Sequence, residues 1–204
     1  MDPIMGGIDT ELAKKEEEYY ARIGFHRNNV YKAFVNLIKN PASNIMIYDK
    51  PVYLIADKVE PDVRNHDMSK YSDEEFYPYR LKWFPTAKEK IRLDNDEEFA
   101  KKMMDDFELA WKHHEKNNDH HPQYWCLDKD GEPTEPRDMS IVAMLHMICD
   151  WEGMSMEVGG CTKDWWVANR EDKSKYMTDN TLKFVDMIIS QLPDIKYPVN
   201  KNGG

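Results

Sequence analysis

Histidines gather in one short stretch of the chain, which reads AWKHHEKNNDHHPQYW from Ala110 to Trp125. Four of the seven histidines of the protein lie in it: His113, His114, His120 and His121. An ordinary surface helix does not need so many imidazoles, because histidine is a middling helix former and its ring nitrogens need hydrogen-bond partners when they are buried. The stretch therefore predicts coordination of a metal ion.

The other three histidines lie outside this stretch, and two of them stand close to an aspartate. His66 is followed directly by Asp67, and His146 lies four residues before Asp150. His26 lies in an early segment with helical periodicity, on the face that carries the apolar residues and is expected to point inward. For His26 taken alone, a buried core histidine is the usual interpretation.

This order along the chain resembles the H…HD…D signature of the HD-domain metal-dependent phosphohydrolases, in which members with two metal ions carry extra histidines before the last aspartate. A longer pattern, H…HDxSKxxxxEF…AWxHHxxxNxHHxxYW…DW, is more closely similar to that of a bacterial and phage family. No activity of that family can be carried over to this chain. The resemblance covers roughly residues 20 to 155. It is carried by His26, His66–Lys70, Glu75–Phe76, Ala110–Trp125 and Asp150–Trp151.

The resemblance to HD-domain proteins implies a set of metal ligands. A first ion would be held by His26, His66, Asp67 and Asp150. A second ion would be held by His114 and His121, with His120 as a further candidate and Asp67 as the bridging carboxylate. Such ligands suit divalent manganese, iron, nickel, cobalt or zinc, whereas magnesium prefers oxygen. For His146, a supporting or surface position is favoured over direct coordination.

The same resemblance indicates the reaction, which is hydrolysis of a small phosphorylated substrate, a nucleotide or cyclic nucleotide, by a metal-activated water. The candidate catalytic residues are Asp67, Lys70 and Glu115. Lys70 is also a candidate phosphate contact, with capping and solvation as its alternative. Candidate substrate contacts are Tyr79, Asn118, Tyr124 and Trp125, although core packing is the alternative for each aromatic residue. Two other functions stay open: a non-catalytic, metal-stabilised binding module, and a di-iron oxygenase.

Composition narrows the class of protein. The chain has 204 residues and a formal net charge of -10, which disfavours binding along a nucleic-acid polymer because that requires a basic face. No apolar run is long enough to span a membrane, and the start of the chain lacks an export signal. The three cysteines form no CxxC pair and are expected to be reduced thiols of a cytoplasmic protein. The oligomeric state stays undetermined.

The elements expected to position these residues are helical. Apolar periodicity predicts helices at 9–40, 72–84, 94–119, 139–156 and 178–192. Residues 41–65 are interrupted by three prolines, with a short helix or extended run at 52–59, and residues 128–137 are expected to form a loop or hairpin. We therefore expect one all-α domain, an HD-like bundle of about five to seven helices, with a loose leader at 1–8 and a frayed tail at 193–204.

Within this plan, the apolar periodicity of the helix predicted at 94–119 sets the direction of the first two rings of the histidine-rich stretch. His114 lies four residues after Ala110 and seven after Phe107, so it is aimed inward, while His113 is turned about 100° away. The residues before Pro122 are expected to leave the helix in an extended conformation. Asp67 follows His66 directly, and it can share an ion with that histidine only if it reaches across from a turn.

Overall fold

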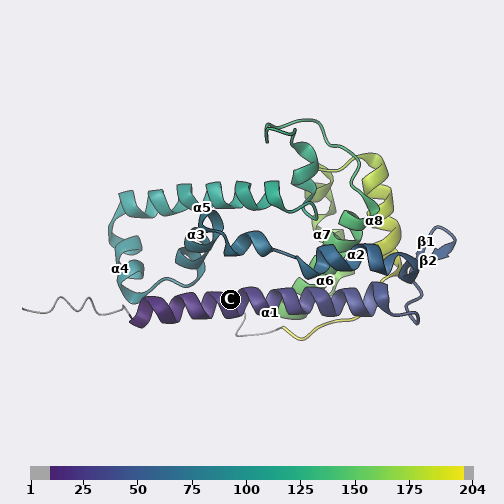
Figure 1. Ribbon diagram of the computed structural model, residues 1–204, viewed down its shortest axis with the longest axis horizontal. Helices are drawn as coiled ribbons and strands as arrows, with labels where there is room; N and C mark the ends of the chain where they lie inside the picture. The colour runs from purple at the N-terminus through teal and green to yellow at the C-terminus, as the bar shows by residue number, and fades with distance from the viewer. Residues whose placement is uncertain (1–9, 200–204) are drawn as a thin grey trace, which may run out of the picture. The chain divides into compact units, whose positions relative to one another are not determined.

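The computed structural model describes residues 10–199. In this range the chain forms eight α-helices and one two-stranded hairpin (Figure 1), which confirms the all-α class with one helix more than the upper end of the predicted range. The helices are α1 (Thr10–Phe34), α2 (Ala56–Arg64), α3 (Asp73–Trp83), α4 (Ala87–Asn95), α5 (Glu97–Asn117), α6 (Ile141–Val158), α7 (Thr162–Ser174) and α8 (Asp179–Gln191).

The chain divides into two compact units, and helices α1 and α5 each contribute to both. The first unit contains the chain up to Gly24 together with Met68–His114, and the second contains Phe25–Asp67 together with the chain from Glu115 onward. The prediction of a single domain stays a prediction.

The first unit has an aromatic core. Tyr19, Ile23, Tyr79 and Ala110 are buried there, and they come from helices α1, α3 and α5. The guanidinium of Arg80 is also buried, and it is held by Glu89, whose carboxylate at the same time closes a capping box with Thr86 at the start of α4. This arrangement joins α3 to α4 by a charge-assisted bond.

The second unit is built around α6. Its remaining elements, besides the end of α1 and helices α2, α7 and α8, are a π-helix η1 (Val35–Lys39), strands β1 (Met46–Ile47) and β2 (Lys50–Pro51), and 3₁₀ helices η2 (Val52–Ile55) and η4 (Pro122–Cys126). Helix α6 starts at Ser140, whose hydroxyl accepts a hydrogen bond from the backbone N–H of Ala143. Most of its side chains are buried, which fits the strongly apolar sequence from which this helix was predicted.

The predicted inward-facing residues are largely confirmed. Those of α1 and α8 are buried, namely Ile23, Val30, Phe34, Leu37, Val185, Ile188, Ile189 and Leu192. Ile141, which begins α6, is instead 41% exposed, and Phe99, Met103 and Phe107 of the predicted buried face of α5 are only half-buried. Two helices, α4 and α7, were not predicted.

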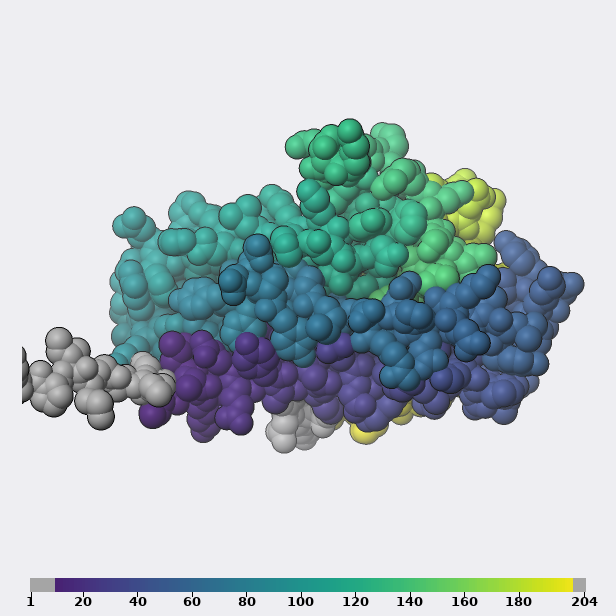
Figure 2. All heavy atoms as spheres, in the orientation of Figure 1, coloured from purple at the N-terminus to yellow at the C-terminus, as the bar shows by residue number. Residues whose placement is uncertain are grey.

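The tail is also more ordered than predicted. The backbone of Tyr197 exchanges two hydrogen bonds with Gly160, of 2.8 and 3.0 Å, and its hydroxyl donates to Glu152 at 2.7 Å. Residues 193–199 are thus joined to the connection between α6 and α7, and the rest of the predicted tail, with the predicted leader at 1–8, lies outside the described residues. The connection between η4 and α6 projects from the second unit as a loop (Figure 2), as predicted.

Among residues 10–199, none of the helices combines the length and the apolar character needed to pass through a lipid bilayer.

Gly153 allows helices α1 and α6 to approach closely. A Cβ atom at this position would lie 2.9 Å from the backbone nitrogen of Val30 and 3.1 Å from its Cα. Backbone atoms cannot swing aside as a flexible side chain can, so the helices must separate to admit a methyl group. Because Val30 is four residues after His26, and Gly153 three after Asp150, this contact also sets the distance between those two side chains.

We predict that Gly153→Ala destabilises the protein. Overpacking of a tight helix contact costs about 1–3 kcal/mol, whereas Ala for Gly in an open helix position gains up to about 1 kcal/mol. Gly24→Ala is the matched control, since a Cβ at this helical glycine meets no atom within 4 Å. Urea denaturation followed by circular dichroism measures both variants. A Gly153→Ala protein as stable as Gly24→Ala would contradict the proposed close contact.

Candidate metal centre

His66 and Asp67 occupy a turn that follows α2, and Asp67 has an unusual backbone conformation there. Its φ is 54°, in the left-handed region that residues other than glycine, asparagine and aspartate rarely adopt. Its carboxylate lies beside the preceding ring, with Oδ2 3.4 Å from Nε2 of His66. This turn meets the geometric condition under which Asp67 could share an ion with His66, and the role of both residues as ligands stays a prediction.

Four donor atoms come together from three elements of the second unit, which are α1, the turn after α2, and α6. Nε2 of His26 lies 3.0 Å from Nε2 of His66, 3.1 Å from Oδ1 of Asp150 and 3.7 Å from Oδ2 of Asp67. Nε2 of His66 lies 3.7 Å from Oδ1 of Asp150. Ligands bound at about 2.1 Å from one ion are separated by about 3.0 Å at right angles and about 3.4 Å at tetrahedral angles. His26, His66 and Asp67 therefore form a group that could hold a metal ion, and Oδ1 of Asp150 lies beside both of its imidazoles.

Hydrogen bonds on the outer side of each ring direct Nε2 toward this common point. Nδ1 of His26 is 2.8 Å from Oε1 of Glu157, and because a carboxylate only accepts, Nδ1 carries the proton. Nδ1 of His66 is 2.9 Å from Nε2 of His146. Outer contacts of this kind accompany most metal-ligating histidines, since they fix the ring and its tautomer. His146 thus occupies the supporting position that was favoured from the sequence.

The protonation states also suit coordination. Burial lowers the pKa of His66 well below its ordinary value and that of His146 to about 3, so both rings are neutral near pH 7. Burial alone would lower the pKa of His26 as well, but its hydrogen bonds with Asp150 and Glu157 outweigh this effect and raise it to about 9. Burial would raise the pKa of Asp150, but His26 and the other nearby imidazoles lower it, so this carboxylate is ionised. A proton on His26 and a metal ion compete for the same lone pair.

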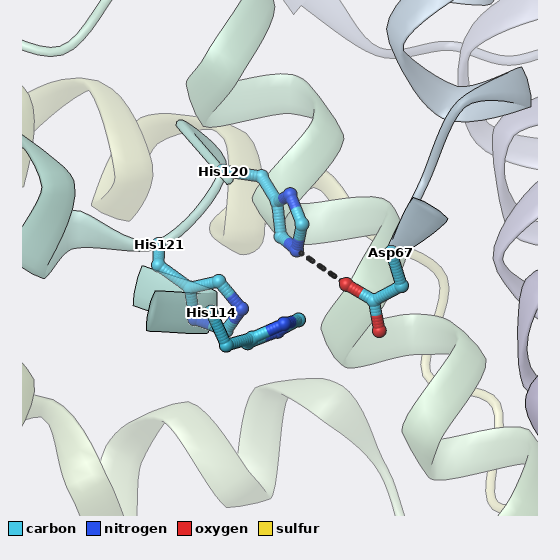
Figure 3. A group of neighbouring side chains, drawn as sticks. All are labelled: Asp67, His114, His120 and His121. Atoms are coloured by element: carbon cyan, nitrogen blue, oxygen red, sulfur yellow. Dashed lines mark ion pairs between the residues drawn. The ribbon is translucent and has the colours of Figure 1, made fainter. Parts of the chain in front are cut away.

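The two carboxylate oxygens of Asp67 face different histidines. Oδ2 belongs to the four-atom group, whereas Oδ1 lies 3.4 Å from Nε2 of His120, the contact drawn in Figure 3. Asp67, His120 and His121 each bring one donor atom to within 4.8 Å of the others. Asp67 is therefore oriented as a carboxylate that can serve two neighbouring cation positions.

A further group consists of imidazoles alone. His66, His120 and His146 also bring three ring nitrogens within 4.8 Å of one another. This group contains no carboxylate to balance the charge of an ion, and the contact between His66 and His146 already has the length of a hydrogen bond. The group with Asp67 and Asp150 is the better cation site.

The turn between α5 and η4 positions His120 and His121. His121 is extended, with φ -87° and ψ 129°, as predicted for the residue before a proline. Its backbone N–H donates to the carbonyl of Asn118 at 3.0 Å, and the indole of Trp125 donates to the carbonyl of Asp119 at 2.7 Å. Asn118 and Trp125 thus hold this turn in place, and their contacts with a substrate stay predictions.

His114 lies near the end of α5, in the first unit. Its Nδ1 is 2.9 Å from Oε2 of Glu75, whose Oε1 is 2.8 Å from Nδ1 of His113. Burial would raise the pKa of Glu75, but the bonds with both histidines lower it. One buried carboxylate therefore orients both rings, although the sequence indicated that they point about 100° apart. The role of His114 as a ligand stays a prediction.

The remaining candidate catalytic and substrate-binding residues do not belong to the group of donor atoms described above. Lys70 lies in a short 3₁₀ helix of the first unit, η3 (Met68–Tyr71), with Nζ 5.7 Å from the centre of the Tyr79 ring. Tyr79 is buried in the core of that unit, the alternative that the sequence left open. Glu115 and Tyr124 are half-buried in the second unit. The catalytic and substrate-binding roles of these four residues stay predictions.

Two buried glutamates that bond histidines, Glu157 and Glu75, were not predicted from the sequence to have a role. Glu157 lies seven residues after Asp150, close to two helical turns, and this spacing could have placed it beside the metal ligands. Glu75 belongs to the long sequence pattern, but nothing in the pattern indicates that it binds histidines 38 and 39 residues away.

Residues 15–191 match the family model of DUF5662, a family of unknown function. The chain belongs to DUF5662. The match runs from α1 to the end of α8, and it includes every histidine and aspartate of the candidate site. Comparisons of this DUF5662 chain with curated proteins and with solved structures find no match.

We predict that Asp150→Asn removes most of the metal affinity of this DUF5662 protein. The change keeps the size of the side chain but removes the charge, so the loss should exceed the about 10–100-fold that follows loss of an outer hydrogen-bond partner. Elemental analysis of protein purified without added metal, followed by chelator competition, measures the effect. Asp172→Asn is the control, because Asp172 pairs with Lys175 at an exposed site. A wild-type protein that contains and binds no transition metal would disprove the site.

Proposed function

We propose that the protein is a metal-dependent phosphohydrolase that acts on a small phosphorylated molecule, a nucleotide or a cyclic nucleotide. The observation that supports this most directly is that Nε2 of His26 and Nε2 of His66 lie 3.0 Å apart and that each lies 3.1–3.7 Å from a carboxylate oxygen of Asp67 and of Asp150. The resemblance of the sequence to HD-domain phosphohydrolases points to the same four residues.

The charges of this group suit a divalent ion. Asp67 and Asp150 contribute two negative charges, which balance the ion, while the two imidazoles add strong neutral ligands. When bound, such an ion lowers the pKa of a coordinated water and neutralises charge that develops on a phosphoryl group. Four protein ligands leave room for water and one phosphate oxygen in a six-coordinate shell. Manganese, iron, nickel, cobalt and zinc are all compatible with this ligand set.

The residues of the second unit have distinct tasks in this proposal. Asp67 places Oδ2 with the first ligand group and Oδ1 beside His120, so it can bridge two ions. His120 and His121 then supply imidazole ligands to the second position. His146 and Glu157 hold the outer nitrogens of His66 and His26, and they keep both rings fixed while substrate binds.

A small substrate fits the charge of the protein better than a polymer does. The chain carries 38 acidic and 28 basic residues, so a long polyanion would be repelled over most of its contact area. A phosphate group bound directly at a divalent ion depends on local attraction instead. The identity of the base is open, because no base-recognition motif was found in the sequence.

We predict that purified protein with manganese releases phosphate or nucleoside from at least one member of a panel of nucleotides and cyclic nucleotides. Asp67→Ala should reduce this activity below detection, because it removes a ligand of the ion. Asp67→Asn tests the same point without backbone strain, since asparagine tolerates positive φ. Asp57→Ala, an exposed change in the first turn of α2, should keep full activity.

The same experiment separates the alternatives. A protein that binds metal tightly but releases nothing under any of the metals would favour a metal-stabilised binding module. An iron-dependent optical band together with oxygen uptake would favour the oxygenase. Activity that survives Asp67→Asn would disprove the assignment of the reaction to this group of residues.

A further inference from the structure

Glu157 is a buried carboxylate that touches a metal ligand from outside. It lies on α6 with only 4% of its surface exposed. Its Oε1 is 2.8 Å from Nδ1 of His26 and also accepts a longer hydrogen bond, of 3.4 Å, from the amide of Asn29. A buried ionised carboxylate is costly unless it is hydrogen-bonded or paired, so these contacts hold Glu157 in one orientation.

The position of Glu157 on α6 brings it to the same side as the ligand Asp150. Seven residues at about 100° each return to within about 20° of the starting direction. Gly153 lies between the two, at a close contact between α6 and Val30 of α1. One face of α6 therefore carries the candidate ligand Asp150, the glycine that packs closely against α1 and, one turn after that glycine, the carboxylate that bonds the ring of His26.

We propose that Glu157 is a positioning residue of the metal centre, which fixes His26 in the tautomer that coordinates through Nε2. By accepting the proton of Nδ1, the carboxylate leaves Nε2 as the nitrogen that can coordinate an ion and makes the ring a stronger ligand. Glu157 itself makes no bond to the ion. This inference rests on the proposed metal site, and it adds a residue for which the sequence indicated no function.

Glu157→Gln is the decisive variant, because it keeps the size of the side chain. The neutral amide is a weaker acceptor, and in its flipped orientation it donates to Nδ1 and places the proton of His26 on Nε2. We expect the affinity for cobalt or zinc, measured by chelator competition, to fall about 10–100-fold. Glu157→Asp restores the charge on a shorter side chain and should recover part of the loss.

Glu152→Gln is the matched control. Glu152 is on the same helix, is also buried, at 5% exposed, and bonds Thr162 and Tyr197 and no histidine. Its substitution removes an equally buried charge, so any general loss of stability should be similar. We expect Glu152→Gln to keep the metal affinity of the wild-type protein.

Two spectroscopic measurements separate positioning from mere folding. Nitrogen NMR of the zinc-loaded protein should show the proton of His26 on Nδ1 in the wild-type protein and, in Glu157→Gln, a fraction of rings that carry it on Nε2 and are not coordinated. The visible bands of the cobalt protein should shift in Glu157→Gln and stay unchanged in Glu152→Gln.

The outcomes distinguish this inference from the proposed function, because none of these measurements uses catalysis. Wild-type affinity and unchanged cobalt bands in Glu157→Gln would overturn the inference and leave the hydrolase proposal standing. Equal losses in Glu157→Gln and Glu152→Gln would overturn it too. A metal-binding wild-type protein with the expected Glu157→Gln defect but no phosphohydrolase activity would support the inference and reject the function. A wild-type protein that binds no ion overturns both.

Discussion

The central constraint on the second unit is that it holds the electron-rich donor atoms of His26, His66, Asp67 and Asp150 close together in its interior. Two imidazole nitrogens lie 3.0 Å apart, each with two carboxylate oxygens at 3.1–3.7 Å, and acceptor atoms at these distances repel each other unless a positive charge lies among them. A proton on His26 relieves part of this repulsion, which is why its pKa is raised despite burial. A divalent cation would relieve it more fully, because it carries twice the charge of a proton.

Helix α6 combines an apolar surface that packs into the core with one polar stripe that faces the candidate metal centre. His146, Asp150, Gly153 and Glu157 follow one another at intervals of four, three and four residues, so they form one stripe along the helix. The rest of the helix surface is mostly apolar and is packed into the core. The hydrophobic packing fixes α6, and α6 in turn fixes the ligand and both outer hydrogen bonds.

The sequence predicted what depends on local pattern. The apolar periodicity located five helices, and the His66-Asp67 pair indicated the turn. Helix α4 was missed although Thr86 and Glu89 form a capping-box sequence, because the following acidic segment was interpreted as the first helix start. The specific contacts of Glu157 with His26 and of Tyr197 with Gly160 could not be predicted, since tertiary packing brings these partners together over long distances in the sequence.

The backbone of Asp67 shows how the turn and the chemistry are coupled. A positive φ at a residue other than glycine costs on the order of 1 kcal/mol or more and persists only where the surrounding structure enforces it. Glycine would relieve the strain but has no carboxylate. Aspartate tolerates this conformation and places its two oxygens toward different histidines, Oδ2 toward His66 and Oδ1 toward His120. The strain therefore coincides with the one side chain that can connect two cation positions.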